Sequence, residues 1–256
     1  MEPIFPANPT ERVGYYGGRI AYGLWGEPLN VASDLCFIII IILFFVKLRK
    51  NGFSDKPALI LVILGGLMGF GSAIFHSHPT KVTLQIDLLP ITIFGLAFIA
   101  FSTRRFFNQS YKISTLIPFA FFLLTLGFEK ITNKFQIPGL NHIPSILALI
   151  IIGVLLLKNR LYKRVGKAFM VAAGSYILGL FFRYLDFYVY PTFPLGTHFL
   201  WHAFTFCVVI ILLYTATTYG SIKHQGNIGI RNHKTSPSSH LKYKMAAAHN
   251  NSKFKL

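Results

Sequence analysis

Three histidines in two short apolar phrases are the residues of this chain best suited to chemistry. His76 ends the run Gly-Phe-Gly-Ser-Ala-Ile-Phe-His, and His198 and His202 lie four residues apart in Gly-Thr-His-Phe-Leu-Trp-His. Side chains four residues apart share one face of a helix, so these two imidazoles can bind the same ion. A third imidazole from a facing helix completes the three protein ligands of a catalytic zinc ion, which keeps its fourth position for water. We therefore expect a zinc site made of His76, His198 and His202.

Two more polar side chains would complete a hydrolytic site. Ser72 precedes His76 by one helical turn, and Asp87 follows it after a short link. Hydrolysis at zinc needs a group that takes a proton from water and gives it to the leaving group. We expect Asp87 to be this general acid–base, and Ser72 to hydrogen-bond the water or the developing oxyanion.

The composition places these residues inside a membrane. Of 256 residues, 53% are hydrophobic and only 13% are charged, which is too apolar for a soluble globule of this length. An imidazole in a membrane segment is costly and by default indicates a functional site. Cys36 and Cys207 lie in apolar runs, so we expect them to be small buried hydrophobes and not a disulfide.

Seven apolar runs approach the length needed to cross a hydrocarbon layer of about 30 Å. They cover residues 29–48, 57–75, 82–101, 113–128, 143–157, 168–190 and 197–219. We therefore expect an all-α integral membrane protein with seven transmembrane helices. Its parts are an extracytoplasmic N-terminal segment (1–28), the seven-helix domain (29–219) and a basic, disordered tail (220–256).

Positive charge is distributed unevenly between the links. The net charge is +17, and Lys and Arg gather in the tail and in the links after the first, third and fifth runs. The positive-inside rule then places the N-terminus outside and the C-terminus in the cytoplasm. On this topology the histidines lie within roughly 10 Å of the outer boundary of the hydrocarbon layer. The charge suits an anionic inner leaflet, and no basic fold with interleaved aromatic residues indicates nucleic acid.

Four other polar residues lie near the ends of the apolar runs. We expect Glu27 to cap the first helix or to pair with Arg19, Arg183 or a lipid group. Asn30 is then its partner or makes a hydrogen bond between helices. Arg183 and Asp186 are one turn apart, and we expect them to pair with each other as a packing element or as support for the zinc ligands.

Together these motifs resemble the alkaline ceramidase family, which belongs to a superfamily of seven-helix transmembrane zinc hydrolases that includes the adiponectin-type receptors. The resemblance covers residues 23–205. The matching blocks are Glu27-Pro-Leu-Asn30-x2-Ser33, Ser72-x3-His76-x10-Asp87-x2-Pro90 and His198-x3-His202. The phrases around Trp25 and Gly196 resemble the bacterial-type branch.

The resemblance implies that the three histidines bind zinc, that Asp87 is the acid–base and that Ser72 supports the transition state. It also implies that the substrate is the amide of a sphingoid base. Animal members carry a calcium site near the N-terminus, of which only Glu27 has a clear match here. Calcium needs six to eight oxygen ligands, so its binding is doubtful in this chain.

We therefore expect a zinc-dependent intramembrane amidase that hydrolyses ceramide or a ceramide-like N-acyl lipid to a fatty acid and a sphingoid-type amine. The alternative is a receptor or signalling protein on the same scaffold, with a structural zinc. A transporter is disfavoured because, beyond Asp34, the inner halves of the helices offer few ionisable residues. The resemblance favours a bacterial inner membrane and leaves a eukaryotic endomembrane open.

Overall fold

The computed structural model describes residues 25–50, 52–135, 139–189 and 192–221. All seven expected runs form helices, and each is long and apolar enough to cross a membrane. Two 3₁₀ turns, η1 (Asn133–Phe135) and η2 (Leu140–His142), lie between the fourth and fifth helices. The helices are α1 (Pro28–Arg49), α2 (Lys56–Ser77), α3 (Lys81–Arg105), α4 (Tyr111–Thr132), α5 (Ile143–Leu157), α6 (Lys163–Val189) and α7 (His198–Thr218). The predicted class, an all-α protein with seven candidate membrane spans, is confirmed.

Several helices are longer than the apolar runs that predicted them. α3 continues to Arg105, α4 covers Tyr111–Thr132, and α6 begins at Lys163. The added turns are rich in Lys and Arg, whose long side chains can keep their charge in water while the backbone remains helical. Hydropathy marks the hydrocarbon layer, and the helices extend past it.

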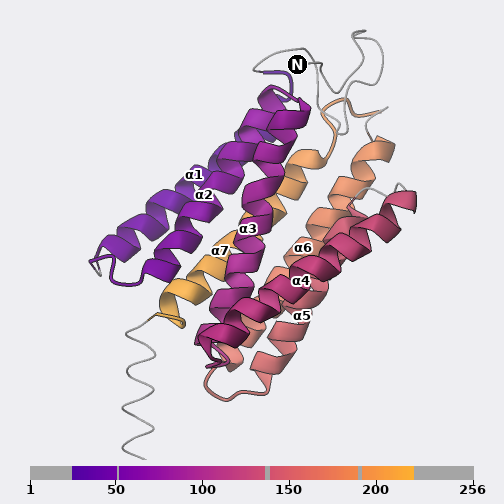
Figure 1. Cartoon of the computed structure of the whole chain (residues 1–256). Helices are drawn as coiled ribbons and strands as arrows, with labels where there is room; N and C mark the ends of the chain where they lie inside the picture. Colours follow the sequence, from indigo (N-terminus) through magenta and orange to yellow (C-terminus); the bar gives the residue numbers. More distant parts are fainter. Residues whose placement is uncertain (1–24, 51, 136–138, 190–191, 222–256) are drawn as a thin grey trace, which may run out of the picture.

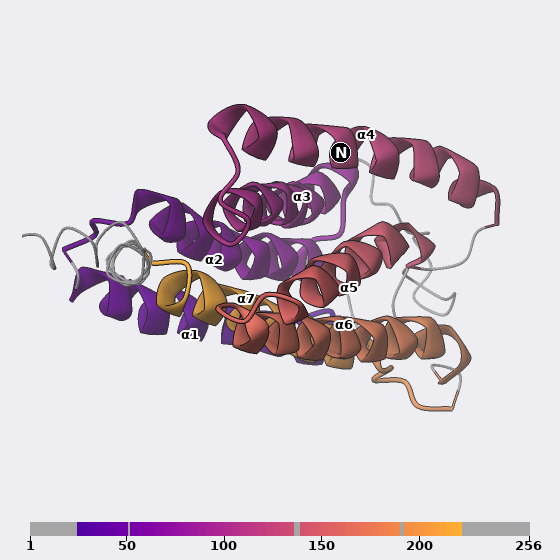
Figure 2. The ribbon, with the colours of Figure 1, turned by 90° about the horizontal axis from the view of Figure 1, so that it is seen from below.

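The helices form one bundle with α7 at its centre (Figure 1). α7 contacts α1, α2, α3 and α6, while α4 packs mainly against α3. The view from below shows α4 as an outer helix beside α3 (Figure 2). The first two turns of α7 are thereby enclosed by the other helices, which places His198 and His202 in the interior.

Short local signals determine the turn between α2 and α3. Thr80 is the N-cap of α3: its Oγ1 accepts the Thr83 backbone N–H at 3.1 Å, and Thr83 Oγ1 accepts the Thr80 N–H at 2.8 Å. This reciprocal capping box satisfies two otherwise unpaired donors. It starts α3 at Lys81, four residues after α2 ends at Ser77, so the turn brings His76 and Asp87 to the same end of the bundle.

Two glycines of α2 let the neighbouring helices approach closely beside Ser72. A Cβ on Gly69 would lie 2.8 Å from the carbonyl oxygen of Asp34 in α1. A Cβ on Gly71 would lie 2.4 Å from the carbonyl oxygen of Ile86 in α3. Real side chains cannot occupy either position, so the two glycines bring the backbones of α1 and α3 against α2.

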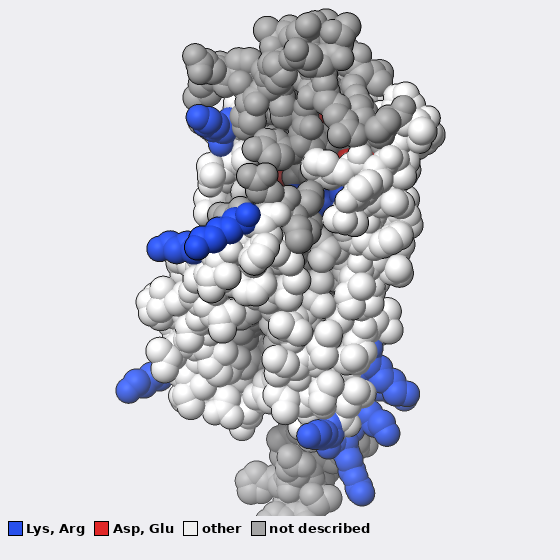
Figure 3. Space-filling view, turned by 90° about the vertical axis from the view of Figure 1, so that its right-hand side faces the viewer, with Lys and Arg blue, Asp and Glu red and all other residues white. Residues whose placement is uncertain are grey.

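The surface of the bundle is largely apolar. A broad band without charged residues lies above the end at which Lys and Arg side chains gather (Figure 3). At that end Arg105 pairs with Asp55 at 3.1 Å, and Lys47 donates to Thr217 and Thr218. Cys36 and Cys207 are both free, and Cys207 is exposed on the apolar surface, not buried as expected.

Candidate metal centre

The structure brings the three predicted histidines together. His76 is in the last turn of α2, and His198 and His202 are in the first two turns of α7. One ring nitrogen from each lies within 4.8 Å of the others, and all three side chains are buried. Nε2 of His198 and Nε2 of His202 are 3.2 Å apart. Three buried imidazoles this close could hold a metal ion.

The ring of His76 is oriented by Glu27. His76 Nδ1 lies 2.5 Å from Glu27 Oε2, which also accepts a hydrogen bond from Asn30 Nδ2 at 2.8 Å. Because a carboxylate accepts, the Nδ1 carries the proton and Nε2 keeps its lone pair. Asn30 is thus the partner of Glu27, as expected. The capping role expected of Glu27 is wrong: it occupies the N-cap position of α1 but makes no side-chain cap, because its carboxylate is engaged by His76.

The ring of His202 is oriented by α1 in the same way. Ser33 Oγ donates its proton to the Asn30 carbonyl oxygen at 2.7 Å. Because its lone pairs remain available, Ser33 Oγ can accept a hydrogen bond from His202 Nδ1 at 2.9 Å. Asp34 Oδ1 lies 3.1 Å from the same nitrogen. A protonated Nδ1 again leaves Nε2 with its lone pair facing the other histidines.

The start of α7 is held by Asp186 of α6. Asp186 Oδ1 accepts the backbone N–H of Thr197 at 2.5 Å and that of His198 at 3.1 Å. Thr197 Oγ1 donates to the Phe182 carbonyl at 2.8 Å. The expected pairing of Asp186 with Arg183 stays a prediction. The structure adds a second role, because Asp186 is a cap supplied from another helix that places the first histidine of α7.

These contacts fit a nitrogen-bound divalent metal. Ligating histidines typically donate their second ring N–H to a carboxylate or another acceptor, which fixes the tautomer and the ring orientation. Two nitrogens bound tetrahedrally at ordinary zinc–nitrogen lengths would be about 3.3 Å apart, close to the separation of the two Nε2 atoms of α7. Each histidine would bind the metal through an imidazole nitrogen, so the set suits zinc, among other metals that bind imidazole.

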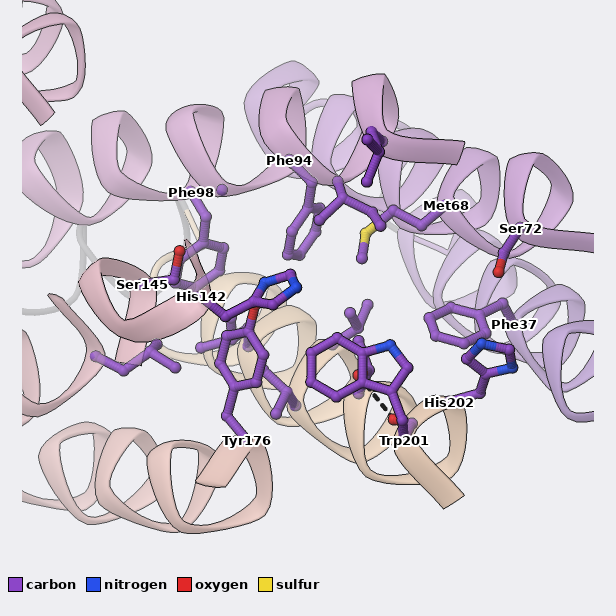
Figure 4. Close-up of a pocket in the computed structure, with 18 of the residues that line it drawn as sticks. Phe37, Met68, Ser72, Phe94, Phe98, His142, Ser145, Tyr176, Trp201 and His202 are labelled. Carbon is purple, nitrogen blue, oxygen red and sulfur yellow. Dashed lines mark hydrogen bonds between the residues drawn. The ribbon is translucent and has the colours of Figure 1, made fainter. Parts of the chain in front are cut away.

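Ser72 and Asp87 lie beside the histidines in the wall of the same cavity. Figure 4 shows Ser72 and His202 on the same side of this cavity. Both side chains are buried, and within the described part of the chain Asp87 Oδ1 has no hydrogen-bond partner. A third acidic or hydroxyl group, Asp34, was noted in the sequence but not assigned to the site. It is 1% exposed and lines the cavity next to Ser72. The signal in the sequence was an aspartate inside the first apolar run, but His202, which Asp34 approaches, is far away in the chain.

The cavity continues from these groups into the apolar interior. Along α3 its wall runs from Asp87 to Ile99, and along α7 from His198 to Leu212. At the rise of an α-helix these stretches are about 18 and 21 Å long. Nearly half of the lining residues are Phe, Leu, Ile and Val, and Figure 4 shows Phe94, Phe98 and Met68 on the α3 and α2 side.

A polar group on the opposite wall was also missed by the sequence analysis. His142 of η2 makes a hydrogen bond between its Nδ1 and the Tyr176 hydroxyl at 3.0 Å. Both rings pack against Trp201, with centroid separations of 4.9 and 5.5 Å. Arg183 also belongs to this cluster, with its guanidinium carbon 5.1 Å from the centre of the Trp201 ring. No local motif connects these four residues, which come from three separate helical segments.

Some expectations concern residues outside the described part of the chain. Arg19, proposed as a partner of Glu27, belongs to this group, as do most of the N-terminal segment and the basic tail.

No protein-family model matches the chain, and no curated protein sequence matches it. The resemblance to alkaline ceramidases therefore depends on the sequence motifs alone and stays a prediction.

Proposed function

We propose that this protein is a zinc-dependent intramembrane amidase that hydrolyses ceramide or a ceramide-like N-acyl lipid to a fatty acid and a sphingoid-type amine. The observation that supports this most is the convergence of three oriented histidines with Ser72 and Asp87 at one end of a long apolar cavity. An acyl chain in that cavity would present its amide bond to the polar end.

The proposed chemistry gives a role to the three histidines, to Asp87 and to Ser72. Zinc bound by His76, His198 and His202 would supply Lewis-acid chemistry, which polarises the amide carbonyl and makes water easier to deprotonate. Asp87 takes the proton from the attacking water at its carboxylate and gives it to the nitrogen as the C–N bond breaks. Ser72 donates a hydrogen bond to the oxyanion that develops on the carbonyl oxygen. The products are a fatty acid and an amine.

Three protein ligands favour this proposal over a receptor with a structural metal. Structural zinc is usually held by four protein side chains, whereas catalytic zinc has three and an open position. The group of described residues that could hold a metal ion consists of three histidines. The carboxylates near them contact imidazole nitrogens or lie beside Ser72. The three histidines line the same cavity as Ser72 and Asp87, so water in that cavity could reach a metal that they hold.

The test compares purified parent protein with the Asp87→Asn variant. We expect the parent to carry about one zinc per chain and to release fatty acid from ceramide. Asparagine keeps the shape of the side chain but cannot exchange a proton, so turnover should fall by at least ~100-fold while the zinc remains. Zinc content is measured by mass spectrometry and products by chromatography.

Two results would contradict the proposal. Unchanged turnover in Asp87→Asn would give the proton transfer to another residue. A parent that is fully loaded with zinc but inactive on every N-acyl lipid tested would favour the receptor.

A further inference from the structure

The cavity contains a cation that the proposed reaction does not use. Among the described residues that line the cavity, Arg183 is the only lysine or arginine. It is half-buried in α6, one turn before Asp186, which accepts the His198 N–H. Arg183 is also close enough to Asp87, His198 and His202 to interact with them electrostatically. The cation therefore lies near the end of the cavity at which the amide would react.

Trp201 and its neighbours hold the guanidinium in position. The guanidinium carbon is 5.1 Å from the centre of the Trp201 ring, and the His142 and Tyr176 rings pack against the same tryptophan. A guanidinium stacked on a ring presents its N–H groups sideways, in a fork that fits a carboxylate or a phosphate. The wall opposite, along α3, is apolar and has no such donors in the stretch from Leu88 to Ile99.

We propose that Arg183, stacked on Trp201, binds an anionic group on the amine part of the substrate, so that the preferred substrate is an N-acyl lipid with a carboxylate or phosphate close to its amide. This inference rests on the proposed function, because it assigns the substrate class of the same site. In a cavity of low polarity, a charge-assisted hydrogen bond to the anion would contribute more than it would in water. A neutral ceramide would then be a weaker substrate.

The test uses two lipids that differ only in this group. A long-chain N-acylglycine and the N-acylethanolamine with the same acyl chain share the amide, but the first has a carboxylate where the second has a hydroxymethyl group. We expect the zinc-loaded parent to have a KM for the N-acylglycine at least about tenfold lower, the scale of one charge-assisted hydrogen bond. The Arg183→Gln variant should lose this difference, and Arg183→Lys should keep part of it.

A second measurement reads binding without turnover. The chain has two tryptophans, and Trp25 is 64% exposed, so the Trp25→Phe variant leaves Trp201 as the only fluorescent indole. Its emission should respond to the N-acylglycine at lower concentration than to the N-acylethanolamine. The matched control is Arg104→Gln, because Arg104 also stacks on a ring, that of Tyr111 at 4.5 Å, but does not line the cavity. It should leave the preference unchanged.

The outcomes separate the two proposals. Equal KM and equal binding of the two lipids by the parent would overturn the inference and leave the amidase intact. A preference for the N-acylglycine that survives in Arg183→Gln would also overturn the inference, since the carboxylate would then bind the metal. An equal loss of binding for both lipids in that variant would overturn it too, because it indicates a structural role for Arg183. An Arg183-dependent binding preference without any hydrolysis would support the anion site and contradict the proposed function.

Discussion

At the scale of single residues, the acceptors beside His76 and His202 determine which ring nitrogen of each histidine faces the metal centre. Glu27 and the Ser33–Asp34 pair engage Nδ1 of His76 and His202, and both rings therefore face the centre with Nε2. Without these acceptors an imidazole could rotate or change its tautomer, and a metal would have to order the ring when it binds. The acceptors thus prepare the ligands before the ion arrives.

The Glu27→Ala variant tests this orientation. We expect its zinc affinity to fall by roughly 10- to 100-fold, the usual effect of removing a group that supports a metal-binding histidine. The affinity is measured by competition with a chelator of known strength. Glu129→Ala is the matched control, because Glu129 is an exposed glutamate at the end of α4. If both variants bind zinc as tightly as the parent, Glu27 does not support the site.

The residue scale also shows why only part of the site could be predicted. His198 and His202 form a local pattern, and Ser72 with His76 forms another, so helical periodicity alone indicates that each pair shares a face. Glu27 contacts His76 across 49 positions of the chain, Asp34 lies 168 positions from His202, and Asp186 contacts His198 across 12. A single sequence contains no periodicity that connects such distant positions, and the polar cluster around Trp201 was missed for the same reason.

At the scale of elements, the position of α2 between α1 and α3 decides whether the site forms. Hydropathy predicted the seven helices because a membrane span must carry apolar side chains along the whole length that crosses the hydrocarbon layer. It could not predict that α7 lies in the centre or which helices touch. Those contacts depend on small residues such as Gly69 and Gly71, whose role becomes apparent only when the facing backbone is known.

Gly71→Ala tests the close approach of α2 and α3. The added methyl group would lie 2.4 Å from the Ile86 carbonyl oxygen, so one helix must shift. We expect a loss of about 1–3 kcal/mol of stability, typical of overpacking, together with reduced activity, because Ser72 and Asp87 would separate. Thermal unfolding in detergent measures the first effect. Gly127→Ala in α4 is the control, since a Cβ there meets nothing within 4 Å; equal Tm values for both variants would contradict the argument.

Over the whole molecule, the metal centre and most of the described Lys and Arg side chains lie at opposite ends. The ends of α2 and α6 and the start of α7 meet at the metal centre, whereas Arg105, Asp55 and Lys47 interact at the other end of the bundle. The Lys and Arg side chains that gather at the lower end of Figure 3 are the kind that the positive-inside rule retains in the cytoplasm. We therefore expect the metal centre to lie near the outer surface, where lipids of the outer leaflet can enter the cavity.

Cysteine labelling tests this orientation in intact cells. In a background with Cys36→Ser and Cys207→Ser, a single cysteine replaces either Phe193, which is 44% exposed between α6 and α7, or the exposed Arg160 between α5 and α6. A thiol reagent that cannot cross membranes should label Phe193→Cys directly and Arg160→Cys only after the cells are permeabilised. The two links lie at opposite ends of α6, so each variant is the control for the other. The reverse pattern would place the metal centre near the cytoplasm, and the substrate would then have to come from the inner leaflet.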